Sequence, residues 1–171
     1  MRLLNYTKVP DDLLREMVRF CNAELHAHGF DITFKNSGNG TLHGRAYTLG
    51  TDYHLRDTDR GCKRVPLVVI TVPKWYSADP VPYCSKKYWQ SGHIGNLRHW
   101  RSRKRQASRG YMLNECWSHH EELVHIVAHE LRHLWQRRVK TGRRVWGARG
   151  QMSERDADAY GIHATRMWRR R

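Results

Sequence analysis

The chain has 171 residues, and its 31 Lys and Arg outnumber 16 Asp and Glu, which gives a formal net charge of +15 and an isoelectric point near 10.2. It contains no internal repeat and no Ser- or Gly-rich linker, so a single domain over residues 1–171 is the simplest division. It has neither a long apolar span nor an N-terminal signal-like stretch, which predicts a soluble intracellular protein, cytoplasmic or, in a eukaryote, nuclear. The charge excess favours a polyanionic partner, with nucleic acid first and an anionic membrane surface second.

A helix is predicted near the N-terminus. Pro10 is followed by Asp11 and Asp12, a pattern typical of a helix start. The apolar residues that follow, as far as Phe20, have helical spacing and predict an amphipathic helix that ends before Gly29.

A small sheet is predicted next. Residues 31–35 alternate weakly between apolar and polar, residues 36–40 favour a turn, and residues 41–49 could return as the partner strand, so a hairpin is expected. Residues 64–73 are a short β-branched run with prolines, the strongest strand pattern in the chain. Its near-continuous apolar character predicts burial on both faces.

Between residues 75 and 116 the composition shifts to cations and aromatic residues, with Asp79 and Glu115 as the acids. Aromatic faces that stack on bases, set among cations that hold phosphates, are typical of a nucleic-acid-binding surface. The same aromatic residues could instead cover one end of the sheet, with the cations simply solvated. The candidate nucleic-acid-binding residues of this basic, aromatic-rich insertion are Lys86, Lys87, Arg98, Arg101, Arg103, Lys104, Arg105 and Arg109.

The four cysteines, Cys21, Cys62, Cys84 and Cys116, contain no Cys-x-x-Cys pair, which argues against a zinc ribbon or finger. Reduced, buried thiols are expected, and one disulfide stays open as an alternative.

A second helix is predicted from about Ser118 to about Val139. Ser118 and Glu121 have the spacing of a capping box, and Gly142 follows a basic stretch that suits a helix end. Between them, apolar residues recur at spacings of three and four, which predicts burial along one side.

Inside this helix, His129, Glu130 and His133 form the pattern His-Glu-x-x-His. Residues four apart on a helix share one face, so both imidazoles can bind one tetrahedral zinc ion with Glu130 beside it as the general base. A zinc ion would polarise a water molecule whose proton Glu130 accepts. His125 lies one turn earlier and either borders this cleft or is a packed histidine.

A catalytic zinc ion needs a third protein ligand and an open position for water. Glu154 is the candidate, because it shares a helical face with Asp158 in a segment that Ser153 could cap. Asp158 could then accept a hydrogen bond from a metal-bound imidazole and fix its orientation. The alternative is that these acids are solvated charges near a helix N-terminus.

At these residues the chain resembles the gluzincin metallopeptidases, most closely the minigluzincins and SprT-like proteins. The resemblance covers roughly residues 118–162 and implies His129, His133 and Glu154 as ligands of one Zn2+ ion, with Asp158 supporting His129. It implies an α+β, small zincin-like fold: an N-terminal helix, a small mixed sheet, the active-site helix and a following ligand helix.

The sequence departs from relatives of that group in two ways. Metzincins place Gly and His three and six residues after the second ligand, where this chain has Gln136 and Val139. The Tyr or His that stabilises the transition state in larger relatives has no sure equivalent, and Tyr160 and His163 are the candidates.

The predicted function is peptide-bond hydrolysis by a zinc-dependent metallopeptidase. The resemblance to SprT-like proteins, together with the charge, implies substrates that are associated with nucleic acid. Two alternatives stay open: a non-catalytic nucleic-acid-binding protein whose zinc site is structural or has lapsed, and an enzyme of the same metal architecture that acts on another bond. A fourth protein ligand from His125 or His163 would favour the structural alternative.

Overall fold

The structure is a computed structural model that describes residues 1–37, 42–47, 54–58, 61–74, 85–90, 93–95, 113–116, 118–138 and 151–171. For residues 54–58, 63, 85–90, 93–95, 113–115, 137–138 and 151–155 it describes the backbone alone. The elements in chain order are β1 (Arg2–Tyr6), α1 (Asp11–Asn22), β2 (Asp31–Ser37), β3 (His43–Tyr47), β4 (His54–Thr58), β5 (Gly61–Val65), β6 (Leu67–Pro73), β7 (Ser85–Gln90), β8 (His93–Gly95), β9 (Leu113–Cys116), α3 (His119–Arg138) and α4 (Gln151–Arg169).

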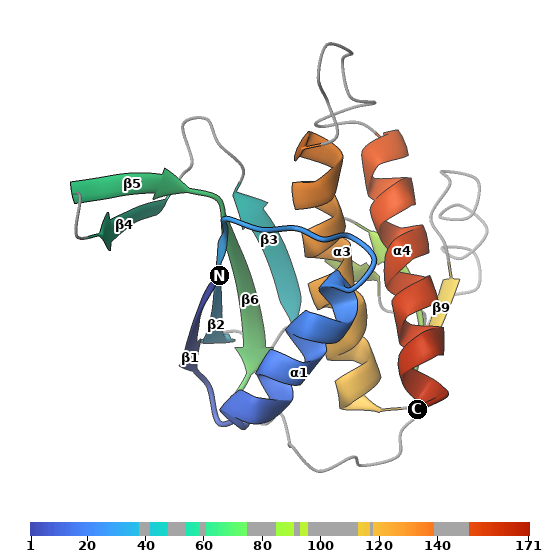
Figure 1. Cartoon of the computed structure of the whole chain (residues 1–171). Helices are drawn as coiled ribbons and strands as arrows, with labels where there is room; N and C mark the ends of the chain where they lie inside the picture. Colours follow the sequence, from blue (N-terminus) through green and yellow to red (C-terminus); the bar gives the residue numbers. More distant parts are fainter. Residues whose placement is uncertain are drawn as a thin grey trace.

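The predicted α+β class is confirmed: a four-stranded mixed sheet in the order β1-β2-β6-β3 packs against helices (Figure 1). β1, β2 and β6 are parallel, and β3 pairs antiparallel with β6. The strong strand pattern forms the central strand β6, where Val68, Ile70 and Val72 are buried. Pro66 separates β6 from β5, because proline cannot donate to a strand ladder.

The predicted hairpin of residues 31–35 with residues 41–49 is wrong. β2 and β3 both form, but each pairs with β6, which lies between them. A central apolar strand needs partners on both edges, and the local turn pattern carries no information about a strand that comes later in the chain. β1, which lacks a clear alternation, is an additional parallel edge strand.

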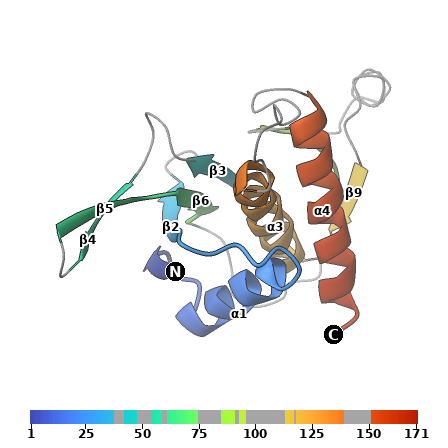
Figure 2. The same cartoon turned by 45° about the horizontal axis from the view of Figure 1, so that its top comes forward.

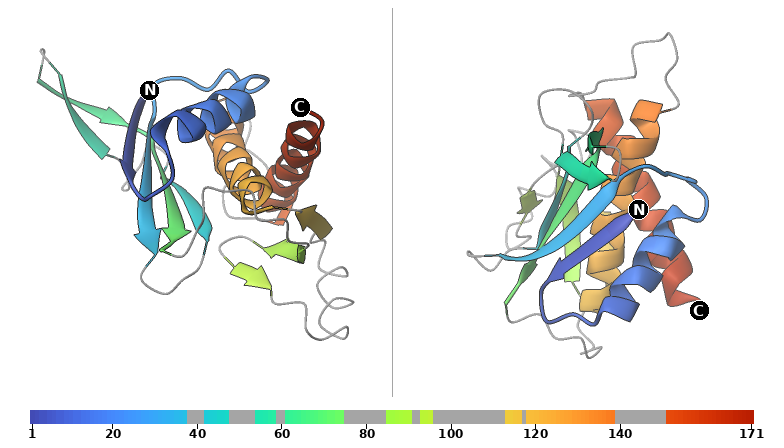
Figure 3. Two further views of the ribbon diagram at one scale, coloured as in Figure 1. Left: turned by 90° about the horizontal axis from the view of Figure 1, so that it is seen from below. Right: turned by 60° about the vertical axis from the view of Figure 1, so that its left-hand side comes forward.

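The expected N-terminal helix is α1, which begins after Pro10 with Asp11 and Asp12 in its first turn. α1 and α3 pack on one face of the sheet, and α4 lies along the side of α3 away from it (Figures 2 and 3). The apolar face of α1, with Leu14 and Met17 fully buried, is therefore covered by the sheet and α3.

α3 is enclosed more completely than the sequence pattern predicts. Every residue from position 121 to position 131 is buried, because the sheet covers one side of the helix and α4 the other. The helix nevertheless carries polar groups at five of these positions, and burying them is costly unless they have partners. These buried polar residues are Glu121, Glu122, His125, His129 and Glu130.

The ends of α3 and α4 show how the pair is held. Ser118 Oγ accepts a hydrogen bond from the backbone N–H of Glu121 at 3.2 Å, as the capping box predicts. The Glu121 carboxylate also accepts two hydrogen bonds from Arg169, at 2.9 and 2.6 Å, so the start of α3 meets the end of α4 and the helices are antiparallel. α4 begins at Gln151, so Ser153 lies inside the first turn and is not the cap that the sequence pattern predicts.

Of the cysteines in the described part of the chain, two are buried and one is exposed. Cys21 is a buried free thiol, as expected, and burial raises its pKa above the usual range. Cys116 is also buried, whereas Cys62 is exposed, so the expectation of a buried thiol is wrong for Cys62, and Cys84 lies outside the described residues. Within the described part of the chain, no helix combines the length and the apolar character that a bilayer crossing requires.

Candidate metal centre

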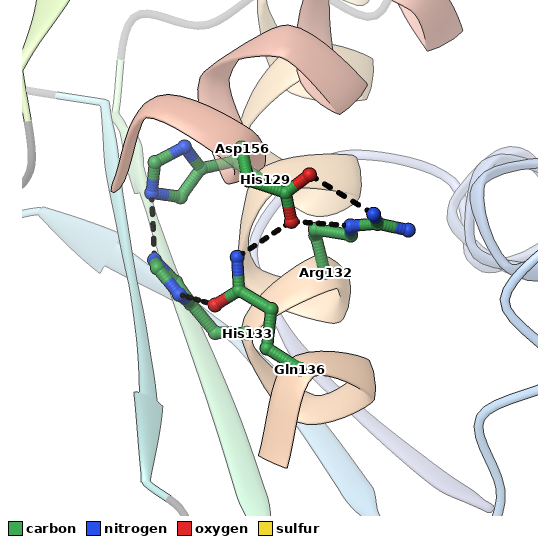
Figure 4. A network of polar contacts seen from close by, with 5 residues as sticks. All are labelled: His129, Arg132, His133, Gln136 and Asp156. Atoms are coloured by element: carbon green, nitrogen blue, oxygen red, sulfur yellow. Dashed lines mark hydrogen bonds and ion pairs between the residues drawn. The ribbon is translucent and has the colours of Figure 1, made fainter. Parts of the chain in front are cut away.

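The two histidines of the His-Glu-x-x-His pattern converge on one point beside α3. Their Nε2 atoms are 3.0 Å apart, and the rings meet edge to face (Figure 4). One helical turn separates the two residues, so the helix itself brings the rings onto one face. His129 is 8% exposed and His133 is half-buried, so the convergence point lies at the edge of the core.

Asp158 of α4 lies against the first histidine. Its Oδ1 is 2.9 Å from His129 Nδ1, and its side chain is almost completely buried. This contact is an ion pair when the His129 ring is protonated. The spacing in the sequence could not tell which imidazole Asp158 contacts, and the antiparallel packing of α4 on α3 decides it.

The second histidine has a different support. His133 Nδ1 is 3.0 Å from Gln136 Oε1, and Gln136 Nε2 donates to Asp156 Oδ2 at 2.8 Å. Arg132 donates to both oxygens of Asp156, at 2.7 and 3.0 Å. In the sequence, Gln136 indicates only that the chain is not a metzincin, and its contact with His133 depends on Asp156 of α4.

Charge and stacking hold this network in place. Partial burial alone would raise the pKa of Asp156, but hydrogen bonds from Arg132 and Gln136 and the positive charge of Arg132 outweigh it, so the pKa is lowered. The Arg132 guanidinium lies 3.7 Å from the centre of the Trp135 ring and 5.5 Å from that of Tyr160. These aromatic faces favour a fixed guanidinium through cation–π attraction.

A second cluster lies deeper in the core. His125, His129 and Asp158 are all buried, and their ligand atoms lie within 4.8 Å of one another, so this group could hold a metal ion. Burial, and then the proximity of His129, lowers the pKa of His125 well below its usual value. Gly161 of α4 packs on this ring, because a β-carbon there would lie 2.8 to 3.0 Å from three ring atoms.

Glu130 points from α3 toward the edge strand β3. Its side chain is buried, and a β-carbon built on Gly44 would lie 2.8 Å from its Oε1. Gly44 is therefore a site residue that the sequence interpretation missed. The available signal was a glycine inside a strand, which often marks close approach by another group.

Glu154 lies in the first turn of α4, where the structure describes the backbone alone. Asp158 of α4 lies against His129 of α3, and the two helices are antiparallel. The residue one turn before Asp158 on α4 therefore lies at the level of the residue one turn after His129 on α3. These two residues are Glu154 and His133. The role of Glu154 as third ligand stays a prediction.

The other candidates lie elsewhere or outside the described side chains. The Tyr160 hydroxyl donates to the Cys21 backbone oxygen at 2.8 Å, and His163 is 3.3 Å from Glu24, so both contact α1 or the segment after it. Burial raises the pKa of Tyr160 above its usual range, with the negative charge of Glu24 adding to the effect. Lys86 and Lys87 lie on β7, where only the backbone is described, and Arg98, Arg101, Arg103, Lys104, Arg105 and Arg109 lie outside the described residues.

Comparison with known proteins gives no assignment: no protein-family model, no curated protein and no solved structure matches this chain.

Proposed function

We propose that the protein is a zinc-dependent hydrolase of peptide bonds, with one Zn2+ ion between His129 and His133. The observation that supports this most is the 3.0 Å separation of the two Nε2 atoms. Two nitrogens bound to one zinc ion at about 2.0–2.1 Å with a tetrahedral angle lie about 3.3 Å apart. In each ring Nδ1 lies beside an oxygen, Asp158 Oδ1 at 2.9 Å or Gln136 Oε1 at 3.0 Å. A hydrogen on each Nδ1 would leave both Nε2 atoms able to bind the ion.

The donor set fits zinc and leaves room for water. Two imidazole nitrogens and a carboxylate are a common catalytic zinc set, and the carboxylate in this proposal is that of Glu154, one turn before Asp158 in the sequence of α4. The inner group of His125, His129 and Asp158 fits a catalytic role less well, because His125 and Asp158 are almost completely buried. Asp158 is better placed to orient His129, as carboxylates behind metal-bound histidines do.

Glu130 is the proposed general base. Bound zinc would polarise a water molecule and lower its pKa. Glu130 follows His129 directly on α3, and Gly44 leaves room for its carboxylate between α3 and β3. From there it would accept a proton from the water molecule that attacks the scissile carbonyl and return this proton to the leaving amine.

The geometry also favours an extended substrate. In the described sheet β3 is an edge strand, and an exposed edge can pair with an added peptide strand through main-chain hydrogen bonds. A peptide paired with β3 would pass close to Gly44 and therefore to Glu130.

The test combines zinc content with cleavage of an unfolded protein such as casein. We expect one zinc ion in the wild type and in Glu130→Gln, with cleavage about 10²- to 10⁴-fold slower in the variant because the general base is lost. His133→Ala and Glu154→Ala should lose tight zinc binding. Wild-type cleavage rates in Glu130→Gln would contradict the mechanism.

A further variant separates the two metal clusters. His125→Gln removes a member of the inner group and should retain zinc if the ion lies between His129 and His133. Loss of zinc in His125→Gln together with full retention in His133→Ala would place the ion in the inner group instead. Near-ultraviolet circular dichroism of each variant checks that the fold is intact.

We further propose that nucleic acid brings this activity to its substrates. The support is the net charge of +15, which favours a polyanionic partner. Binding to a labelled oligonucleotide should weaken steeply between about 50 and 200 mM salt, because phosphate contacts release counterions. Affinity that does not change with salt, or cleavage that added DNA does not accelerate, would contradict this.

A further inference from the structure

The second histidine of the proposed metal centre is held by a directed chain of hydrogen bonds that crosses from α3 to α4. We propose that Gln136 and Asp156 are positioning residues that hold His133 in the tautomer with its hydrogen on Nδ1, so that Nε2 is presented to the metal. This inference rests on the proposed function, because it assigns the support of one of its ligands. Figure 4 shows the chain of contacts.

The direction of each hydrogen bond follows from the chemistry of the groups. Arg132 is a donor only, and it binds both oxygens of Asp156. The Asp156 carboxylate is thus an acceptor, and the group 2.8 Å from its Oδ2 must be the amide NH2 of Gln136. The amide oxygen of Gln136 must then face His133.

The tautomer of His133 is the consequence. The atom 3.0 Å from Gln136 Oε1 is Nδ1, and an amide oxygen only accepts, so Nδ1 carries the hydrogen. A neutral imidazole with its hydrogen on Nδ1 has its lone pair on Nε2. That atom is the one 3.0 Å from His129 Nε2. With the hydrogen on Nε2 instead, His133 could not bind a metal ion through that atom.

The two histidines are supported by different means. Asp158 contacts His129 directly, whereas Asp156 acts on His133 through a neutral amide, and Arg132 balances the charge of Asp156. Glu130, Glu154 and Asp158 already belong to the proposed centre. A further carboxylate in direct contact with His133 would add repulsion that the amide avoids.

The same contacts fix the register of the ligand helix. Asp156 lies between Glu154 and Asp158 on α4 and is bound by two residues of α3. A shift of α4 along α3 would break the three hydrogen bonds at Asp156, so these bonds oppose any movement of Glu154 and Asp158 along α3. The alternative is an ordinary interhelical ion pair with no influence on His133.

The decisive measurement is the tautomer of His133 in the metal-free protein, read from the ring 15N chemical shifts by NMR. We expect the Nδ1–H tautomer in the wild type. Asp156→Asn offers an NH2 group in place of an acceptor, so the Gln136 amide should turn over, present its own NH2 to His133 and favour the Nε2–H tautomer. In Gln136→Met, which lacks the amide, the preference should be lost.

A double variant provides the rescue. In Gln136→Glu combined with Asp156→Asn, the new carboxylate can accept from both the asparagine amide and His133 Nδ1, so the Nδ1–H tautomer should return. Glu121→Gln is the matched control, because it weakens a different ion pair between α3 and α4, with Arg169, far from His133. It should lower stability without changing the tautomer.

Zinc affinity, measured by competition with a chelator, gives a second readout. We expect a loss of about 10- to 100-fold in Asp156→Asn and Gln136→Met, recovery in the double variant and no change in Glu121→Gln. An Nε2–H tautomer of His133 in the metal-free wild type would overturn the inference, as would equal affinity in all variants. If the tautomers behave as expected but the wild type binds no zinc, the positioning stands and the proposed function fails.

Discussion

Gly44 of β3 and Glu130 of α3 pack so closely that position 44 has no room for a side chain. A β-carbon on Gly44 would lie 2.8 Å from Glu130 Oε1 and 2.9 Å from its Cδ. The contact joins the edge strand of the sheet to the proposed general base. The backbone of Gly44 needs no unusual dihedral angle, so the reason for glycine here is space.

Gly44→Ala should displace the Glu130 carboxylate while leaving the two histidines in place. Misplacement of a catalytic group by about 1 Å can reduce the rate about 10²-fold, so we expect a fall in kcat/KM of that order with unchanged zinc content. Ala46→Gly, on the same face of β3, is the control for a general weakening of the strand. Equal activity in Gly44→Ala and wild type would show that Glu130 adjusts freely and that the close packing has no catalytic importance.

Gly161→Ala should destabilise the protein, although the same change in an exposed helix interior usually stabilises by about 1 kcal/mol. The added carbon would lie 2.8 Å from Cε1 of the buried His125 and force α4 away from α3. Overpacking of this kind costs about 1–3 kcal/mol, which urea unfolding can measure. The sign of the change in the free energy of unfolding decides this prediction. A variant more stable than the wild type would mean that the His125 ring moves aside without cost.

The metal-free protein should lose stability as the pH falls below about 6.5, the usual pKa of histidine. His125 has a pKa well below its usual value of 6.5 because it is buried and lies beside His129. In this range the unfolded chain binds a proton at His125 that the folded chain does not bind, so protonation favours unfolding. Asp158 is the nearby acid of the same cluster.

The matched variant for this prediction is His125→Gln, which carries no ionisable group at the position. Its free energy of unfolding should depend less on pH between about 6.5 and 5 than that of the wild type. The lowered pKa of Asp156 affects stability at lower pH than His125 does. Its contribution to the stability of the folded protein is fully present above pH 3.8, the ordinary pKa of Asp, and is lost as the pH falls through the pKa of Asp156 in the folded protein. Parallel curves for His125→Gln and wild type above pH 5 would contradict a neutral, buried His125.

Replacement of Asp158 should weaken zinc binding in a graded way. Asp158→Asn retains an oxygen that can accept from His129 Nδ1, whereas Asp158→Ala retains none, so the asparagine variant should have the smaller loss. Carboxylates behind metal-bound histidines contribute about 10- to 100-fold in affinity, which isothermal calorimetry or chelator competition can measure. Unchanged affinity in Asp158→Ala would remove its orienting role.

Local sequence signals determined the elements that carry the proposed centre. Helical spacing and the Ser118 cap predict the start of α3 to within about one residue, and the spacing of His129 and His133 requires their side chains to share a face. The apolar, β-branched run of residues 64–73 likewise predicts a buried strand, because hydrophobic periodicity depends only on neighbouring residues. The role of Glu154 as a ligand remains a prediction from the same kind of spacing.

Only the tertiary structure decided which partners these elements meet. The choice of β6 over a hairpin for β2 and β3, the approach of Gly44 to Glu130, and the contact of Asp158 with His129 and not His133 all join residues far apart in the sequence. Gln136 gains its place beside His133 through Asp156, which belongs to another helix. Such contacts depend on the register of α4 against α3 and of β3 against β6, and a periodic sequence pattern specifies the face of an element but not its offset along a neighbour.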